Sequence, residues 1–101
     1  MTLTLDLIRQ THAAIGDATL RTPLVRASRL SLQLGIDLYL KLENVQHTNS
    51  FKARGALAKL LTLAEDERRR GGSACSAGNH AQGGAYNATR LGIRAVIVMP
   101  E

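Results

Sequence analysis

The chain has 101 residues and a formal net charge of +5, and 45% of its residues are hydrophobic and 21% charged. This length allows at most one small domain, and the composition is that of a globular protein, not of a disordered one. A single cysteine excludes an internal disulfide framework. No apolar run approaches the roughly 20 residues of a membrane span, and the N-terminus lacks a basic start followed by an apolar core. We therefore expect a soluble protein of the cytoplasm.

The excess of positive charge does not by itself predict a nucleic-acid interface. Basic residues cluster only in the run Arg68 to Arg70, and the two tyrosines and one phenylalanine do not alternate with that run. Nucleic-acid surfaces usually have a longer basic stripe, often with aromatic residues for stacking. A solvated helix end is the favoured interpretation, and a nucleic-acid module is the least favoured.

The N-terminal part of the chain predicts a helix followed by an extended segment. Apolar residues recur at helical spacing over residues 4–15, where Thr4 is a suitable N-cap and Gly16 ends the pattern. Pro23 disfavours helical geometry in the residue before it, which predicts an extended piece around the proline.

A short helix and a strand are expected next. Ser28 is expected to cap a short helix that Gly35 ends. Residues 36–43 then alternate aliphatic and polar or aromatic side chains with a period of two, which predicts a strand.

Two further helices follow a polar link. Apolar residues predict a helix over residues 50–61. Thr62 and Glu65 have the spacing of a capping box for a second helix over residues 63–70, which Gly71 ends.

The last third of the chain predicts a strand, a helix and a strand. Small residues over 73–78 indicate a buried strand end, residues 79–92 indicate a helix, and the β-branched run 93–100 indicates a fully buried strand. Strands and helices that alternate with connections of this length predict an α/β fold. We expect an open, mainly parallel sheet with flanking helices and right-handed crossovers.

One lysine has an unusual setting. Phe51, the only phenylalanine, directly precedes Lys52 in the first turn of a predicted helix. The positive end of a helix dipole and an apolar neighbour both favour a neutral amine, which can attack a carbonyl to form a Schiff base. The alternative is a solvated surface lysine beside a core phenylalanine, and the spacing alone favours this alternative.

A second segment, CSAGNHAQGGA (residues 75–85), leads from a strand end into a helix through small residues. Such a turn leaves backbone N–H groups free to bind an anion, and its glycines permit close approach of the backbone. In open α/β sheets these turns lie where ligands usually bind. The alternative is a glycine-rich helix start that binds nothing, and the pattern itself favours neither.

These segments together carry a family resemblance. KLENVQHTNSFKARGA (residues 41–56) and SAGNHAQG (residues 76–83) resemble the threonine/serine dehydratase (threonine ammonia-lyase) group of fold-type II pyridoxal-phosphate enzymes, which have the tryptophan-synthase β-subunit fold. LGIRAVIVMPE (residues 91–101) is similar to the strand that follows in that family. The resemblance implies conversion of L-threonine or L-serine to a 2-keto acid and ammonia, and it overrides both alternatives above.

The resemblance also implies a role for each matching residue. Lys52 matches the lysine that holds pyridoxal 5'-phosphate as a Schiff base and then acts as the base at the substrate Cα. Phe51 matches the residue that packs on one face of the cofactor ring, and Asn79 matches the side chain that hydrogen-bonds its phenolic oxygen. The loop that holds the substrate carboxylate is matched by Ser76, Ala77, Gly78, Asn79 and His80.

Other reactive side chains are not expected to take part in the chemistry. His80 would contribute through its backbone and packing. His12 and His47 do not have metal-ligand spacing with another histidine, so no metal is expected. Cys75 is expected to be a small buried filler.

Three departures from the family pattern bear on these expectations. His47 and Asn49 stand where the family usually has Pro and Gly, although Asn tolerates left-handed geometry. The run GGSACS (residues 71–76) replaces larger aliphatic residues, which weakens the sheet core beneath the carboxylate loop. The phosphate-binding loop would lie beyond Glu101, so we expect an N-terminal part of a dehydratase that is inactive alone.

The resemblance also sets the expected organisation. Residues 1–70 would belong to the larger, cofactor-binding domain, and residues 71–101 would begin the smaller domain. A small amino-acid substrate and a homo-oligomeric full-length enzyme are implied, with no nucleic-acid or membrane partner. A serine racemase and a non-catalytic remnant are the alternatives.

Overall fold

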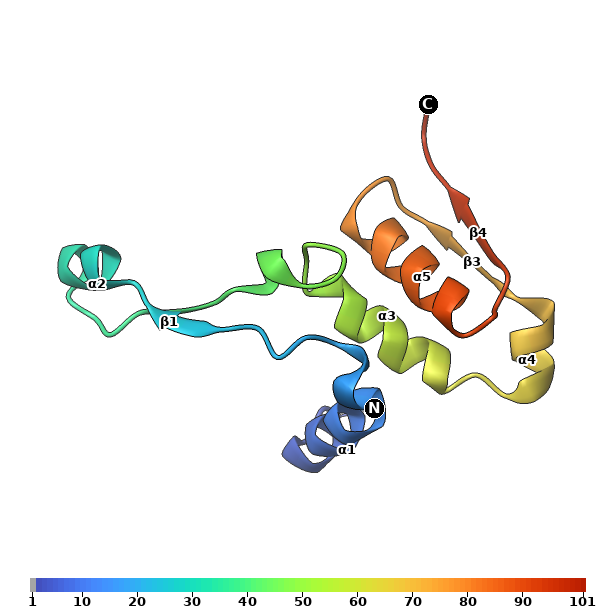
Figure 1. Cartoon of the computed structure of the whole chain (residues 1–101), viewed down its shortest axis with the longest axis horizontal. Helices are drawn as coiled ribbons and strands as arrows, with labels where there is room; N and C mark the ends of the chain where they lie inside the picture. Colours follow the sequence, from blue (N-terminus) through green and yellow to red (C-terminus); the bar gives the residue numbers. More distant parts are fainter. Residues whose placement is uncertain (1) are drawn as a thin grey trace.

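The computed structural model describes residues 2–101, in which helices alternate with short strands (Figure 1). Met1, the first residue of the region 1–70 assigned above to the larger domain, lies outside the described residues. The elements in chain order are α1 (Leu5–Ile15), a 3-10 turn (Gly16–Ala18), β1 (Leu24–Arg26), α2 (Ser28–Leu34), β2 (Tyr39–Lys41), a 3-10 turn (Glu43–Val45), α3 (Lys52–Leu61), α4 (Glu65–Arg70), β3 (Gly72–Cys75), α5 (Asn79–Arg90) and β4 (Ala95–Val98).

Helix α1 begins and ends where its sequence predicts. The Thr4 hydroxyl oxygen accepts a hydrogen bond from the Leu7 amide at 3.2 Å, which satisfies one of the free N–H groups of the first turn. Gly16 ends the helix with a φ of 46°, a conformation that glycine adopts without steric cost. Both terminal predictions for this helix are confirmed.

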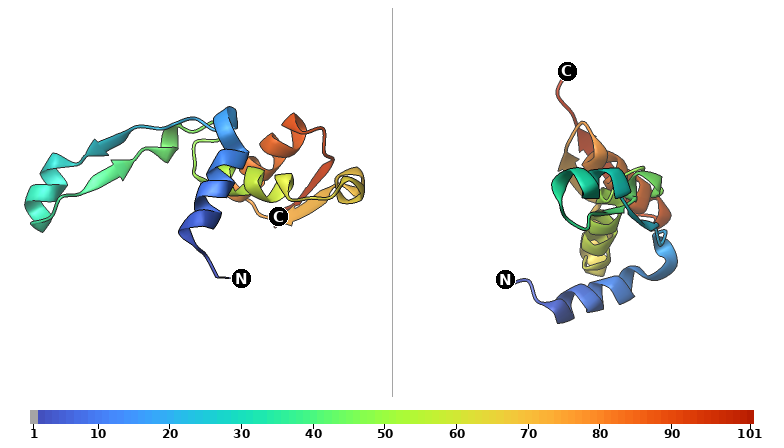
Figure 2. Two further views of the ribbon diagram at one scale, coloured as in Figure 1. Left: turned by 90° about the horizontal axis from the view of Figure 1, so that it is seen from below. Right: turned by 90° about the vertical axis from the view of Figure 1, so that its left-hand side faces the viewer.

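Strand β1, helix α2 and strand β2 form an arm that projects from the rest of the chain (Figures 1 and 2). The two strands are antiparallel, with Leu24 opposite Lys41. Gly35 ends α2 as predicted, with a φ of 66°. The expectation that Ser28 caps this helix is wrong, because Ser28 is already the first helical residue and Ala27 occupies the N-cap position.

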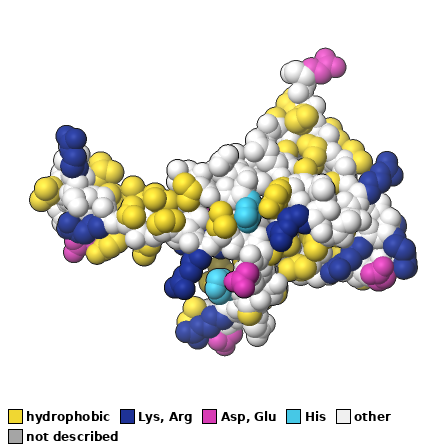
Figure 3. All heavy atoms as spheres, viewed as in Figure 1, with side chains coloured by type: hydrophobic (Ala, Val, Ile, Leu, Met, Phe, Trp, Pro, Cys, Tyr) yellow, Lys and Arg dark blue, Asp and Glu magenta, His cyan; other side chains and the backbone are white. Residues whose placement is uncertain are grey.

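The strand predicted over residues 36–43 is shorter in the structure. Only Tyr39–Lys41 form a strand. The partner strand β1 is three residues long, so the rest of the run 36–43 has no strand beside it to pair with. Both faces of this ribbon are open, and the Tyr39 and Leu40 side chains are 54% and 41% exposed. Figure 3 shows apolar side chains along the whole arm.

The body of the molecule consists of α3 and α5 packed side by side, with the β3–β4 sheet against α5 (Figure 1). Strands β3 and β4 are parallel, with Gly72 opposite Ala95 and Cys75 opposite Val98, and α5 connects them. This β–α–β unit confirms the predicted α/β class. Its buried apolar residues are mostly small, namely Ala53, Ala56, Leu57, Ala81, Ala88 and Ile93.

Three predictions about the body are wrong in detail. Helix α4 starts two residues later than expected, with Ala64 and not Thr62 at the N-cap position. The Glu67 carboxylate, instead of that of Glu65, accepts a hydrogen bond from the Ala64 amide at 2.8 Å. Strand β4 is not fully buried, since Val98 is 55% exposed. Cys75 is exposed and is not a buried filler. The sheet has a helical layer on one face only among residues 2–101, so its other face is open.

The arm gives the chain an extended outline. The radius of gyration is 16.3 Å, against about 13 Å for a compact chain of 100 residues. Within residues 2–101, no helix is both long enough and apolar enough to cross a membrane.

Candidate active site

Lys52 lies in the first turn of α3, as predicted, but the helix begins at Lys52 and not at residue 50, and Phe51 is its N-cap. The Lys52 ammonium nitrogen lies 5.5 Å from the centroid of the Phe51 ring. The ring is 62% exposed, so it does not belong to the core and presents a flat apolar surface beside the amine. A half-buried lysine with this neighbour is a candidate for covalent chemistry.

Helix α5 packs directly on the backbone of Lys52. A Cβ atom at Gly83 would lie 3.0 Å from both the carbonyl carbon and the carbonyl oxygen of Lys52, and 3.1 Å from the Ala53 nitrogen. Only glycine allows this approach of the two helices. The N-terminal ends of α3 and α5 consequently lie at the same end of the body (Figure 1).

The loop over residues 76–80 lies at the N-terminal end of α5. The Ser76 amide donates to the Val98 carbonyl at 3.0 Å, which extends the β3–β4 ladder by one bond. The Ser76 hydroxyl accepts from the Gly78 amide at 3.3 Å, and Asn79 begins the helix. Residues 77–80 are exposed, so the loop presents its backbone at the end of α5 that lies beyond Gly83.

An ion pair between Arg54 and Glu43 connects the first turn of α3, which contains Lys52, to the segment that precedes it. The Arg54 guanidinium donates to the Glu43 carboxylate through Nε and Nη2, both at 2.8 Å, and also to the Leu20 carbonyl at 2.9 Å. The Thr22 hydroxyl donates to the same carboxylate. The bonds from Arg54 lower the pKa of Glu43 to about 2, against the opposing effect of its partial burial, with a smaller contribution from Thr22.

The buried Gln46 side chain also connects residues 19–22 to the loop that precedes α3. It is 2% exposed and forms a pair of hydrogen bonds with the backbone of Leu20, donating to the carbonyl and accepting from the amide, both at 2.9 Å. The same Gln46 oxygen accepts from the His47 amide at 3.1 Å. Residues 19–22 are thereby bound to the loop that precedes α3.

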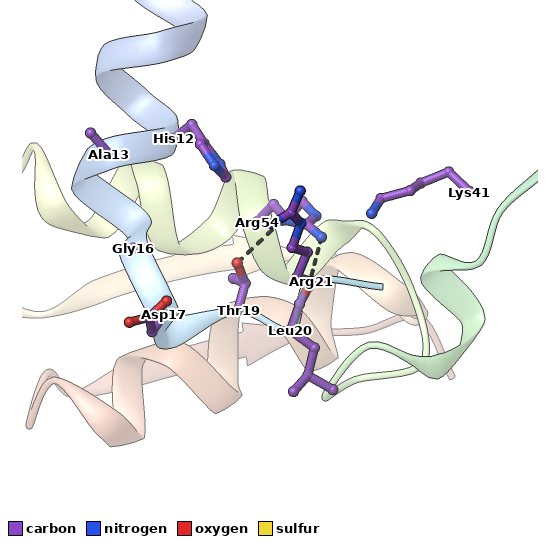
Figure 4. Close-up of a pocket in the computed structure, with 9 residues that line it drawn as sticks. All are labelled: His12, Ala13, Gly16, Asp17, Thr19, Leu20, Arg21, Lys41 and Arg54. Atoms are coloured by element: carbon purple, nitrogen blue, oxygen red, sulfur yellow. Dashed lines mark hydrogen bonds between the residues drawn. The ribbon is translucent and has the colours of Figure 1, made fainter. Parts of the chain in front are cut away.

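A hollow of about 720 Å³ lies on the side of this network that faces α1 (Figure 4). Arg54 reaches toward Thr19 and Leu20 in its wall. Neither Lys52 nor any residue of the 76–80 loop lines this hollow, so it is separate from the candidate site. Its lining residues are His12, Ala13, Gly16, Asp17, Thr19, Leu20, Arg21, Lys41 and Arg54.

The turn before Lys52 has the geometry that its sequence allows. Asn49 has a φ of 53°, and its amide donates to the Gln46 carbonyl at 2.7 Å. The expected tolerance of left-handed geometry at this position is confirmed. His47 stacks on Tyr86 of α5 with ring centroids 5.5 Å apart, which adds a second contact between this turn and α5.

Three side-chain oxygens around Lys52 are buried without a hydrogen-bond partner in the described part of the chain. They belong to Thr48, Ser50 and Asn87. The Asn87 side chain is 1% exposed and donates to the carbonyls of Ala53 and Gly83, both at 2.9 Å. Buried polar groups without partners are rare in proteins and are often found at functional sites.

Sequence reasoning did not single out the groups that support Lys52. Glu43 and Arg54 carry opposite charges on either side of the lysine segment, which is the one signal in the sequence that indicates a pair. Gln46 and Asn87 read as surface polar residues, and their burial depends on contacts between distant segments.

The body thus contains a helix that starts at a half-buried lysine, with an exposed ring beside it and a turn of small residues at the start of the adjacent helix. A family model for pyridoxal-phosphate-dependent enzymes matches residues 15–101. The chain belongs to this family of pyridoxal-phosphate-dependent enzymes.

Individual relatives agree with this family. An L-threonine ammonia-lyase of Thermotoga maritima is 49% identical over 99 residues, which cover 98% of this chain and 25% of that protein. A solved structure of a threonine deaminase from T.th. is 47% identical with a TM-score of 0.82, covering 97% of this chain and 31% of that one. A serine racemase structure from Dictyostelium discoideum is 36% identical with a TM-score of 0.92, covering 100% and 33%. The chain therefore spans about a quarter to a third of the length of these relatives.

Proposed function

We propose that this chain forms the lysine-bearing part of a pyridoxal-phosphate-dependent ammonia-lyase that converts L-threonine or L-serine to a 2-keto acid and ammonia. The observation that carries the proposal is the position of Lys52, at the start of α3 beside the exposed Phe51 ring and under the backbone of Gly83. The 49% identity to a protein named L-threonine ammonia-lyase supports the choice of reaction.

The residues present fit one end of pyridoxal phosphate. A primary amine is the group that condenses with the cofactor aldehyde, and the Phe51 ring offers an uncovered apolar face of the size of a pyridine ring. Asn79 begins α5 with an exposed amide side chain that can donate to an oxygen of the cofactor. Within residues 2–101 the match therefore concerns the aldehyde side of the cofactor.

Each residue of the site has a separate task in this proposal. The cofactor supplies an electron sink when it is bound. Lys52 holds the cofactor and afterwards moves the proton from the substrate Cα, while Phe51 packs on the ring. The Ser76 and Gly78 amides already donate to the Val98 carbonyl and the Ser76 hydroxyl, so the backbone N–H groups of residues 77, 79 and 80 and the Ser76 hydroxyl would hold the substrate carboxylate, which orients the Cα–H bond. The β-hydroxyl would take up a proton and leave as water; the enamine that remains would tautomerise to an imine, and addition of one water to the imine would release ammonia and the keto acid.

The wider organisation is also part of the proposal. Residues 1–70 would belong to the larger domain and residues 71–101 to the start of the smaller one. The arm exposes large apolar side chains, such as Leu32 at 83% and Leu24 at 63%, which a further part of a larger fold would cover. We propose a cytoplasmic, homo-oligomeric enzyme when the protein is complete.

Serine racemization is the second candidate function. It is favoured by the TM-score of 0.92 with the Dictyostelium discoideum serine racemase, higher than the 0.82 with the threonine deaminase. Both reactions start with removal of the Cα proton, so Lys52 would serve either. A non-catalytic remnant is the outcome if no cofactor binds.

The test uses the complete protein with added pyridoxal phosphate. Keto acid released from L-threonine and from L-serine, and D-serine formed from L-serine, are measured separately. We expect keto acid from at least one substrate, and its loss in Lys52→Ala. Lys59→Ala is the matched control, because Lys59 is exposed on the same helix. D-serine without keto acid would favour the racemase, and the formation of neither product would contradict both functions.

A further inference from the structure

Asn87 is buried at the contact between α3 and α5, one turn along α5 from Gly83. Its side-chain amide nitrogen donates to the carbonyl of Ala53, which follows Lys52, and to the carbonyl of Gly83, which packs on Lys52. One amide thus links the two backbone positions that enclose the lysine.

We propose that Asn87 is a positioning residue that sets the register of α5 against the first turn of α3, and thereby the placement of the 76–80 loop relative to Lys52. This inference rests on the proposed function, because it concerns the geometry of the same site.

The contact between the two helices explains why a register device is needed. Apart from Leu57 and Asn87, the buried residues of the two helices are all small, namely Ala53, Ala56, Ala81, Gly83 and Ala88. Small residues let two helices approach closely but interlock weakly, so apart from the close contact at Gly83 the packing gives little preference for one register over its neighbours. The hydrogen bond from Asn87 to the Ala53 carbonyl forms in only one of these registers and therefore makes that register more stable than the others. A single buried asparagine has the same effect in coiled coils, where it selects register at a cost in stability.

The unpartnered oxygen of Asn87 supports a positional role. Its Oδ1 atom is buried without a hydrogen-bond partner among residues 2–101. Burial of an unpaired acceptor is unfavourable, so the residue is a poor choice for stability alone. Of its two donated bonds, the one to Ala53 crosses from α5 to α3 next to Lys52, and the one to Gly83 stays within α5.

Movement of α5 would reach both parts of the site. The helix begins at Asn79 and carries the 76–80 loop at its end, and the same helix touches the Lys52 carbonyl through Gly83. A slide along α3 therefore changes the distance between the carboxylate loop and the amine. Catalysis is sensitive to displacements of this kind, because a shift of about 1 Å can reduce the rate by about a hundredfold.

The test compares Asn87→Ala with Thr89→Ala in the complete protein. Thr89 is exposed on α5, and its hydroxyl bonds within its own helix, to the Ala85 carbonyl at 2.9 Å. We expect Asn87→Ala to lower kcat about tenfold or more with a smaller change in KM, while the unfolding midpoint changes little because the unpaired acceptor is removed too. Thr89→Ala should leave both constants unchanged.

Hydrogen exchange in the cofactor-free protein provides a readout that does not depend on activity. Asn87→Ala should speed exchange of the amides of residues 53–58, at the start of α3, and Thr89→Ala should not. Unchanged kcat and unchanged exchange in Asn87→Ala would overturn the inference. If that variant fails to fold, Asn87→Ser, which keeps one donor, should give an intermediate kcat, and a wild-type kcat there would equally overturn it. An inactive wild-type protein would count against the proposed function, while the exchange comparison would still decide the role of Asn87.

Discussion

Arg54 holds Glu43 through two parallel hydrogen bonds of 2.8 Å each, in an ion pair where the side chains are 26% and 14% exposed. Arg54 lies two residues after Lys52, and Glu43 lies at the start of the segment that leads to it. The pair therefore joins the two ends of the segment 43–54, which contains the candidate catalytic lysine. Bidentate pairs of this kind fix orientation as well as distance.

The ion pair predicts a stability loss in acid. The pKa of Glu43 is about 2 in the folded chain against an ordinary value of 4.5, because Arg54 and Thr22 stabilise the carboxylate. The folded-state pKa is depressed, so the contribution of the pair is complete above about pH 4.5 and is lost as the pH falls toward 2. Denaturant unfolding between pH 2 and pH 6 should show a free energy of unfolding that falls across this interval.

Glu43→Gln should reduce the free energy of unfolding near pH 7 by about 1–3 kcal/mol, because it leaves the guanidinium without its charged partner. It should also flatten the acid dependence between pH 4.5 and pH 2. Asp37→Asn is the matched control, since its ion pair with Arg26 is solvent-exposed and should contribute little. An unaltered acid profile in Glu43→Gln would contradict the role given to this pair.

Two adjacent glycines of α5 should respond oppositely to alanine. Gly83→Ala places a Cβ 3.0 Å from the Lys52 carbonyl group, which is backbone and cannot rotate away, so the helices must separate at a cost of about 1–3 kcal/mol. Gly84→Ala meets nothing within 4 Å and should stabilise the helix by up to about 1 kcal/mol. Thermal unfolding of both variants tests this, and equal midpoints would show that α5 does not pack on Lys52 as described.

Asn49 should be replaceable by glycine but not by alanine. Its φ of 53° suits glycine, so Asn49→Gly should change stability by less than about 0.5 kcal/mol, whereas Asn49→Ala should cost about 1 kcal/mol. Asn44→Ala, at an exposed position of ordinary φ, is the comparison. If Asn49→Ala and Asn44→Ala unfold alike in denaturant, the left-handed turn before Lys52 is contradicted.

Local patterns predicted most elements of this fold. Helix α1, with Thr4 and Gly16 at its ends, and the place of Lys52 at the start of α3 depend on interactions within a few residues, and they follow from the sequence directly. The strand bounds did not. The run 36–43 alternates over eight residues, yet only three pair, because the length of a strand depends on its partner.

Burial was the less predictable property. The run 93–100 has the composition of a buried central strand. Val98 is nevertheless 55% exposed, because β3 and β4 form a sheet of only two strands and helices cover only one of its faces. The supports of the site were hidden for a similar reason. Gln46 and Asn87 become buried through contacts with residues 26 and 34 positions away, which no local pattern records.

The central claim is that the Lys52 amine carries the cofactor. The most direct measurement is borohydride reduction of the complete protein with pyridoxal phosphate, followed by peptide mass mapping. We expect one reduced adduct on the peptide that contains Phe51 and Lys52, and no adduct there in Lys52→Ala. Reduction that labels Lys41 or Lys59 instead, or that labels no lysine, would contradict the account.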